Sequence, residues 1–437
     1  MEVDQKTRRD LELLQTRDGR PGVFQTLDLT KTSGGSRALR FRFDNPISDV
    51  DLIHQVQDGV RFLVSEGIEF SVDPNLVAEV EHYLRSSWAV SRQKSGLRLF
   101  FESSAISFRY RDLLLEARAG IRATQLLLSQ LIPFLKGLEE RNPPSEVRRP
   151  VVNLLALIDR IRLDQLSLTR RPWTTLKADR FLRAERKSDF QRFFELLYDL
   201  DSLIAMASAV REFGLSLPEV VESPSFLLEG EGVFHPFLQD PVGNPVRIAG
   251  GTELVFLTGP NMSGKTTYLK AVGISAFLAH LGMGVPAKHF RISPLHRLFS
   301  SLSPEENLWE GLSYFMSEVR RVREAADYVA RGDRTLVIFD EVFRGTNVRD
   351  AREASRMVIS GFAKCRTSGF VFSSHLVELA EDFGTRSGVQ FQHFDGEIKE
   401  GQTRYEFQLK EGVSEQRFGL QLLEQEGIPE ILKSFEK

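Results

Sequence analysis

The feature that most constrains this chain is a glycine-rich segment between a strand-like run and a helix-like run. Residues 259–266 fit the pattern G-x-x-x-x-G-K-[S/T], with the apolar run 253–258 before it and a helix-forming run after it. In such a loop the glycines let backbone N–H groups turn towards phosphates at a helix N-terminus. A plain glycine turn before a helix is the competing interpretation, and the strand–loop–helix context argues against it. The candidate phosphate-binding residues are Gly259, Pro260, Asn261, Met262, Ser263, Gly264, Lys265, Thr266 and Thr267.

Two further apolar runs end in residues that can work on a bound phosphate. Leu336–Phe339 is followed by Asp340 and Glu341, and another run ends just before His375. Asp340 is suited to holding Mg²⁺ through water, and Glu341 to polarising an attacking water as general base. With Lys265 on the β- and γ-phosphates and Thr266 as a Mg²⁺ ligand, we expect His375 to contact the γ-phosphate. The predicted catalytic residues are therefore Glu341, His375 and Lys265.

The two halves of the chain differ in the spacing of their apolar residues. Apolar residues recur at helical spacing in 50–63, 113–138 and 190–213, whereas short apolar strands alternate with helical runs after Pro224. Alternation of this kind is typical of a parallel sheet with crossover helices. We therefore expect α/β plus all-α architecture, with a helical domain over residues 1–218 and an α/β domain over 219–437.

Composition narrows the class of protein. The net charge of −3, from 57 basic and 60 acidic residues, argues against a generally basic polyanion binder. A single cysteine, Cys365, excludes an internal disulfide framework and fits a reducing compartment. No apolar stretch reaches the roughly 20 residues of a bilayer span, and the acidic start lacks a signal-peptide pattern. The sequence predicts a cytoplasmic protein with no membrane partner.

At these motifs the sequence resembles the MutS family of ATPases, a branch of the ABC-type P-loop proteins. The resemblance covers nearly the whole chain, including segments at its start that are similar to the family's core, or lever, domain. The segments that carry it are Thr7–Leu13, Ser36–Leu39, Val233–Pro236, Gly259–Tyr268, Gly311–Glu318, Asp340–Thr346, Ser374–His375 and Gly412–Pro429.

The resemblance implies a helical core and lever domain, followed by an ABC-type P-loop ATPase domain with a C-terminal helix-turn-helix dimerisation region. It implies ATP and Mg²⁺ as cofactors, with Thr266 and Asp340 as metal ligands. It also implies a homodimer in which Ser313 of the signature loop faces the nucleotide held by the partner subunit. Because Pro241 stands where the family has an aromatic residue, contact with the adenine is expected to fall to Val242 and Phe407.

The departures from the family matter for function. The chain begins at the core domain, so we expect no Phe-x-Glu mismatch reader, and the short core predicts that the DNA clamp is absent. Three Phe-x-Glu triplets occur, which is the number that chance gives for 33 Phe in this composition. DNA is thus expected to be bound without mismatch selectivity, and a protein partner is expected to supply substrate recognition.

Three functions stay open on the sequence alone. The leading one is a DNA-directed, ATP-gated homodimer in mismatch-repair-like or recombination-related work. The second is an ATP-gated factor on ribosomes or another ribonucleoprotein, and the third is a scaffold without useful turnover, against which the intact catalytic residues argue. A basic stripe, Lys177, Arg180, Arg183, Arg186, Lys187 and Arg192, is interpreted as a solvated helix face in preference to a polyanion contact.

Overall fold

The computed structural model describes residues 1–16, 18–86, 111–161, 171–302, 314–383, 388–399, 402–414, 427–433 and 435. They form two compact units, each built from separate stretches of chain. The first comprises residues 1–26, 45–54 and 210–437, and the second comprises 27–44 and 55–209. The division predicted at residue 218 differs from these units, because the first 26 residues belong with the sheet-containing unit. As a division into domains it stays a prediction.

The sheet-containing unit holds a seven-stranded sheet in the order β1-β7-β8-β9-β5-β10-β11. All neighbouring strands are parallel except β10 and β11, which pair antiparallel. A smaller four-stranded sheet has the order β2-β6-β3-β4. The strands are β1 (Glu2–Val3), β2 (Glu219–Val220), β3 (Leu228–Val233), β4 (Asn244–Ile248), β5 (Leu254–Thr258), β6 (His289–Ile292), β7 (Arg297–Ser301), β8 (Thr335–Asp340), β9 (Gly369–Ser373), β10 (Val389–Lys399) and β11 (Gln402–Glu411).

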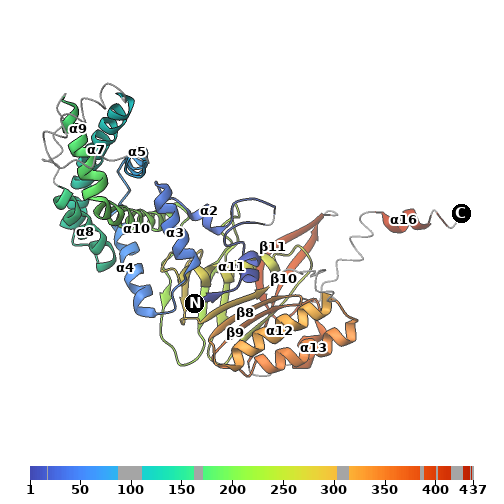
Figure 1. Ribbon diagram of the computed structural model, residues 1–437. Helices are drawn as coiled ribbons and strands as arrows, with labels where there is room; N and C mark the ends of the chain where they lie inside the picture. The colour runs from blue at the N-terminus through green and yellow to red at the C-terminus, as the bar shows by residue number, and fades with distance from the viewer. Residues whose placement is uncertain are drawn as a thin grey trace. The chain divides into compact units, whose positions relative to one another are not determined.

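Helices cover both faces of the large sheet (Figure 1). On one face, α12 and α13 pack on aromatic and aliphatic side chains such as Phe256, Phe339 and Phe372. On the other face α11 approaches closely, since a Cβ on its Gly273 would lie 3.1 Å from Ile338 Cδ1. The helices of this unit are α1 (Gln5–Asp10), α2 (Val23–Leu27, whose last residue is counted with the second unit), α11 (Lys265–Ala279), α12 (Tyr314–Ala330), α13 (Val348–Phe362), α14 (Glu378–Phe383) and α16 (Ile428–Lys433).

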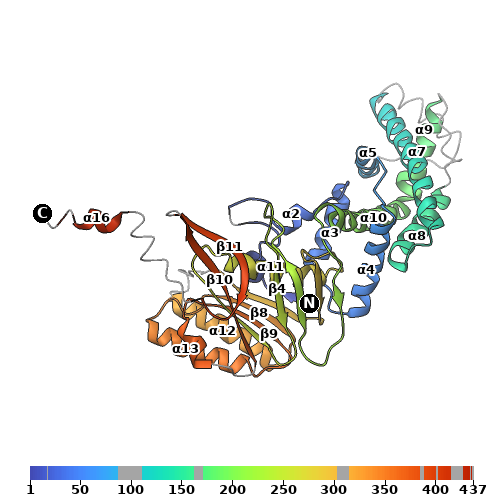
Figure 2. The same ribbon diagram turned by 180° about the vertical axis from the view of Figure 1, so that it is seen from behind.

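The fully apolar strands explain this layering. Both faces of β5, β8 and β9 are buried, so their sequences are continuous apolar runs, as is usual for parallel strands between helices. Figure 2 shows β10 and β11 continuing the sheet beyond β5. The mixed α/β character expected from the sequence is confirmed, and the carboxyl ends of β5, β9 and β8 meet at one edge.

The second unit is helical. Its elements are α3 (Ser33–Asp44), α4 (Val50–Ser65, whose first turn is counted with the other unit), α5 (Pro74–Arg85), α7 (Arg111–Glu140), α8 (Ser145–Ile161), α9 (Pro172–Arg180), the π-helix η2 (Phe181–Glu185) and α10 (Lys187–Glu212, which runs on into the other unit). Helix α7 packs against α5, α8 and α9 (Figure 1). Gly120 permits the contact with α5, since a Cβ there would lie 2.1 Å from the Tyr83 ring.

The prediction that the basic stripe is a solvated helix face is wrong at the centre of the stripe. The Arg183 side chain is only 4% exposed, pairs with Asp179 and donates to the Ser86 carbonyl oxygen at 2.5 Å. Arg183 lies in the π-helix η2, which interrupts the helical spacing between α9 and α10. The exposed members, Lys177, Lys187 and Arg192, therefore do not continue through Arg183 as one surface row.

The described helices include none that is both long and apolar enough to cross a bilayer.

Candidate functional site

The glycine-rich motif forms the loop between β5 and α11, as its sequence context predicts. Gly259 and Gly264 have φ angles of 142° and 102°, which residues with a side chain rarely adopt. A Cβ on Gly259 would also lie 2.6 Å from the Phe394 carbonyl oxygen. The Lys265 ammonium lies under the loop and donates to the carbonyl oxygens of Gly259 at 2.8 Å and Pro260 at 2.9 Å. The loop is thus closed around its own lysine.

Asp340 and Thr266 come together at the end of β8. The Thr266 hydroxyl donates to Asp340 Oδ2 at 2.5 Å, and the Ser373 hydroxyl donates to Asp340 Oδ1. Residues 340 and 373 are paired across the parallel strands β8 and β9, which is why Ser373 can reach this carboxylate. The two residues predicted to hold Mg²⁺ are therefore adjacent, as oxygen ligands of one ion must be.

Glu341 lies between two cationic side chains and an imidazole. Its carboxylate is 2.7 Å from His375 Nε2 and 3.8 Å from the Lys265 ammonium, and it forms an ion pair with Arg344. The residue is 8% exposed and has a φ of 51°, a left-handed conformation that costs roughly 1–3 kcal/mol. The structure therefore brings the three predicted catalytic residues, Glu341, His375 and Lys265, to one point.

Burial lowers the pKa values of two of these groups. It lowers the pKa of Lys265 to about 8, against the attraction of Asp340, which raises it. It lowers the pKa of His375 to about 4, and the nearby Lys265 and Arg344 act in the same direction. His375 is therefore neutral at pH 7, and its Nε2–H can donate to Glu341.

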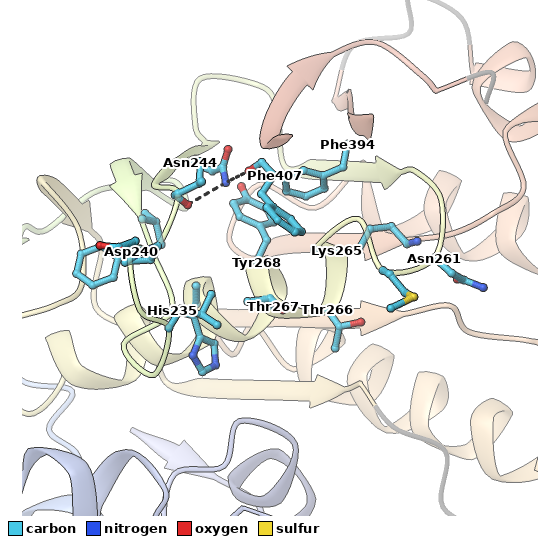
Figure 3. Close-up of a pocket in the computed structure, with 18 of the residues that line it drawn as sticks. His235, Asp240, Asn244, Asn261, Lys265, Thr266, Thr267, Tyr268, Phe394 and Phe407 are labelled. Atoms are coloured by element: carbon cyan, nitrogen blue, oxygen red, sulfur yellow. Dashed lines mark hydrogen bonds between the residues drawn. The ribbon is translucent and has the colours of Figure 1, made fainter. Parts of the chain in front are cut away.

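A cavity of about 450 Å³ extends from this point (Figure 3). Lys265 and Thr266 line it together with Val242 and Phe407, so the structure joins the predicted phosphate end to the predicted adenine contacts. Val242 is 38% and Phe407 44% exposed, which is high for apolar side chains. Two accessible apolar groups at one end and cationic and hydroxyl groups at the other suit an amphipathic ligand such as a nucleotide.

The sequence analysis assigned no role to three residues of this region. Arg344 pairs with Glu341, Asn244 bonds to the backbone of Phe407, and the Tyr268 hydroxyl donates to the Pro245 carbonyl oxygen at 2.8 Å. Arg344 lies in the segment that resembled the family, three residues after Glu341, and that proximity could have indicated it. Nothing in the sequence pairs Asn244 with Phe407, 163 residues away.

Two predicted elements fall wholly or largely outside the described residues. Ser313, the expected signature residue, is one, and α12 begins directly after it at Tyr314. The C-terminal dimerisation region, predicted from Gly412 onwards, is the other, and only residues 412–414, 427–433 and 435 of it are described. Within the part of the chain that the structure describes, no group of three or more His, Cys, Asp or Glu side chains could hold a metal ion.

Comparison with known proteins assigns the family. A family model described as MutS domain III matches residues 6–333, and one described as MutS domain V matches residues 255–437. The DNA mismatch repair protein MutS of Aquifex pyrophilus is 25% identical over an alignment 527 residues long, covering 98% of this chain and 61% of that protein. The DNA mismatch repair protein MutS of Fervidobacterium nodosum is 28% identical over 248 residues, covering 56% and 30%. The chain thus spans less than two thirds of the length of these relatives. Because the domain III match alone covers most of the sequence, the chain belongs to the MutS family.

Proposed function

We propose that this chain is a Mg²⁺-dependent ATPase with an ABC-type P-loop fold. The observation that carries the proposal is the convergence of Lys265, Thr266, Asp340, Glu341 and His375 at the carboxyl ends of three adjacent parallel strands. Open α/β sheets bind their ligands at that edge. Membership of the MutS family supports the same activity.

The loop has the properties that a polyphosphate requires. Ser263 Oγ is buried and has no hydrogen-bond partner among the described residues, so a donor is in place without an acceptor. Lys265 supplies a cation under the loop, and α11 begins there, where backbone N–H groups favour an anion. In this proposal residues 259–267 hold the phosphates, while Val242 and Phe407 contact the adenine.

Thr266 and Asp340 fit Mg²⁺, which takes few protein oxygens and completes its shell with water and phosphate. When bound, the ion would offset negative charge on the phosphate oxygens. The Ser373 hydroxyl orients the Asp340 carboxylate from the opposite side.

Glu341 has the role of general base in this proposal. It accepts a proton from water, and neutral His375 donates its Nε2–H to the Glu341 carboxylate, which fixes the carboxylate's orientation. Lys265 and Arg344 place positive charge beside the same carboxylate. The chemistry that the geometry supports is hydrolysis of a phosphoanhydride.

The larger proposal is an ATP-gated homodimer that acts on DNA without mismatch selectivity, with Ser313 completing the partner subunit's site. A protein partner would then supply substrate recognition. The two relatives above are named DNA mismatch repair proteins, which supports DNA over the ribosomal alternative. Nothing described in this structure favours that alternative or a scaffold without turnover.

Replacing Glu341 with glutamine tests the catalytic assignment. Glu341→Gln should bind ATP and Mg²⁺ like the unmodified protein, yet hydrolyse ATP about 10²–10⁴-fold more slowly, because general-base catalysis is worth about that much. Equilibrium binding of labelled ATP and single-turnover phosphate release measure the two quantities separately.

Glu353→Gln is the matched control, since Glu353 is an exposed residue of α13 that is 65% accessible and outside the cavity. It should hydrolyse ATP at the unmodified rate. Hydrolysis by Glu341→Gln at that same rate would contradict the role of Glu341. A protein that binds no ATP at all would contradict the proposed function.

A further inference from the structure

Asn244 occupies an unusual position at the first residue of β4. Its side chain is 6% exposed, and both ends of its amide are used. The amide nitrogen donates to the Phe407 carbonyl oxygen at 2.9 Å and to the Val242 carbonyl oxygen at 3.3 Å. The amide oxygen accepts the Leu409 N–H at 2.7 Å. One side chain thus connects the loop before β4 to strand β11 (Figure 3).

The two contacts with β11 flank residue 408, directly after Phe407. A donor to the carbonyl of residue 407 and an acceptor for the N–H of residue 409 are the pair that a neighbouring strand would provide. Phe407 has a φ of 54°, a conformation that aromatic residues rarely adopt and that the surrounding structure must hold. Asn244 therefore holds the backbone at the one point of β11 where the Phe407 ring turns into the cavity.

The Phe407 ring is in turn placed against the phosphate loop. A Cβ built on Gly264 would lie 3.2 Å from Phe407 Cδ1, so the ring occupies the space beside this glycine. On the other side, the buried Tyr268 hydroxyl ties Pro245, the residue after Asn244, to the first turn of α11. Asn244 and Tyr268 together fix the apolar end of the cavity relative to Lys265 and Thr266.

We propose that Asn244 is a positioning residue that sets the separation of Val242 and Phe407 and thereby the affinity for the nucleoside part of the ligand. This inference rests on the proposed nucleotide site. Among the described residues, the Asn244 side chain bonds to backbone groups of Val242, Phe407 and Leu409 and not to the catalytic residues. Its effect is therefore expected at the base and not at the phosphates.

The test compares ATP with inorganic triphosphate, which lacks the nucleoside, each with Mg²⁺. Asn244→Ala should weaken ATP binding about tenfold and change triphosphate binding by less than about twofold. In steady-state assays KM for ATP should rise, while kcat should stay within about twofold of the unmodified value. The reason is that the variant loses only binding that is equal in the ground state and the transition state. Tyr268→Phe, which removes one hydroxyl, should shift the ratio of the two dissociation constants in the same direction.

Gln408→Ala is the matched control, because Gln408 is an exposed amide side chain next to Phe407 on the same strand. It should leave both dissociation constants unchanged. If Asn244→Ala and Tyr268→Phe leave the ratio of the ATP and triphosphate constants unchanged, the positioning role is overturned while the nucleotide site stands. If the unmodified protein binds neither ligand, the proposed function fails, and this inference fails with it.

Discussion

One buried histidine connects three stretches of the sheet-containing unit through its ring and its backbone carbonyl. His280 is fully buried at the end of α11, where its Nδ1–H donates to the Ala276 carbonyl oxygen at 2.7 Å. Its Nε2 accepts the Leu295 N–H at 2.8 Å, and its own carbonyl oxygen accepts the Ile47 N–H at 2.7 Å. An N–H donor facing Nε2 leaves no place for a second ring proton, so the neutral tautomer is fixed.

This arrangement predicts a pH dependence of stability. Burial lowers the pKa of His280 to about 4 in the folded protein, against about 6.5 in the unfolded chain. As pH falls from 6.5 towards 4, the unfolded chain takes up a proton that the folded protein does not, so stability falls by up to about 1.4 kcal/mol per pH unit. Urea unfolding at pH 7, 6 and 5 should show this loss.

The variant His280→Gln isolates the contribution. It should be less stable at pH 7, because buried hydrogen bonds are weakened, yet its stability should fall less steeply with acid. His235, whose pKa burial also lowers to about 4, keeps part of the slope in both proteins. Parallel curves for the two proteins would contradict the assignment to His280.

At this scale the sequence predicted the residues that a local motif defines. Lys265 and Thr266 followed from a loop pattern, and Asp340 and Glu341 from their place after an apolar strand. Asn244 and His280 could not be predicted, because their partners are backbone groups whose positions depend on the folded chain. A polar side chain that bonds to distant backbone leaves no spacing signal in the sequence.

Among the elements, α1 and α12 are joined through one arginine. Arg321 of α12 donates to Asp4 at 2.9 Å, to the Thr7 hydroxyl at 3.1 Å and to the Ser300 carbonyl oxygen at 2.7 Å. Its guanidinium lies 3.6 Å from the centre of the Phe299 ring, a cation–π distance. Helix α1 is thereby held against the end of β7 and against α12.

Arg321→Met should therefore destabilise the protein by about 2–3 kcal/mol, since it leaves the half-buried Asp4 carboxylate and the Ser300 carbonyl without their cation. Arg323→Met is the control on the same helix, because the Arg323 side chain is 81% exposed, and it should change stability by less than about 0.5 kcal/mol. Chemical unfolding curves give both values. Equal losses would refute the role given to Arg321.

Apolar patterns predicted three of the helices and the central strands, and missed the shortest strands. The helical runs 50–63, 113–138 and 190–213 correspond to α4, α7 and α10, and the apolar runs to β5, β8 and β9. Strand β1 has two residues, too few to carry a pattern, and its place beside β7 depends on tertiary pairing. The π-helix η2 interrupts the helical repeat within the predicted basic stripe, and Arg183 in it is buried.

For the whole molecule, the proposed DNA activity predicts how affinity varies with substrate and salt. Binding to duplex DNA should be largely indifferent to a mismatch, because no mismatch reader is recognisable in this sequence, and should weaken steeply as salt rises, since phosphate contacts dominate. Titrations of perfect, mismatched and branched duplexes at two salt concentrations measure both effects. A mismatch preference above about tenfold, or about 1.4 kcal/mol, would contradict it.

The chain passes between its two compact units four times, at residues 26/27, 44/45, 54/55 and 209/210. In topological terms the helical unit consists of two insertions within the sheet-containing unit. No strand of the seven-stranded sheet belongs to either insertion. Related chains could therefore lengthen, shorten or exchange the helical part without altering one strand pairing, whereas a cut at residue 218 would remove β1 and the Asp4 partner of Arg321. A complete sheet-containing unit therefore requires the chain on both sides of residue 218.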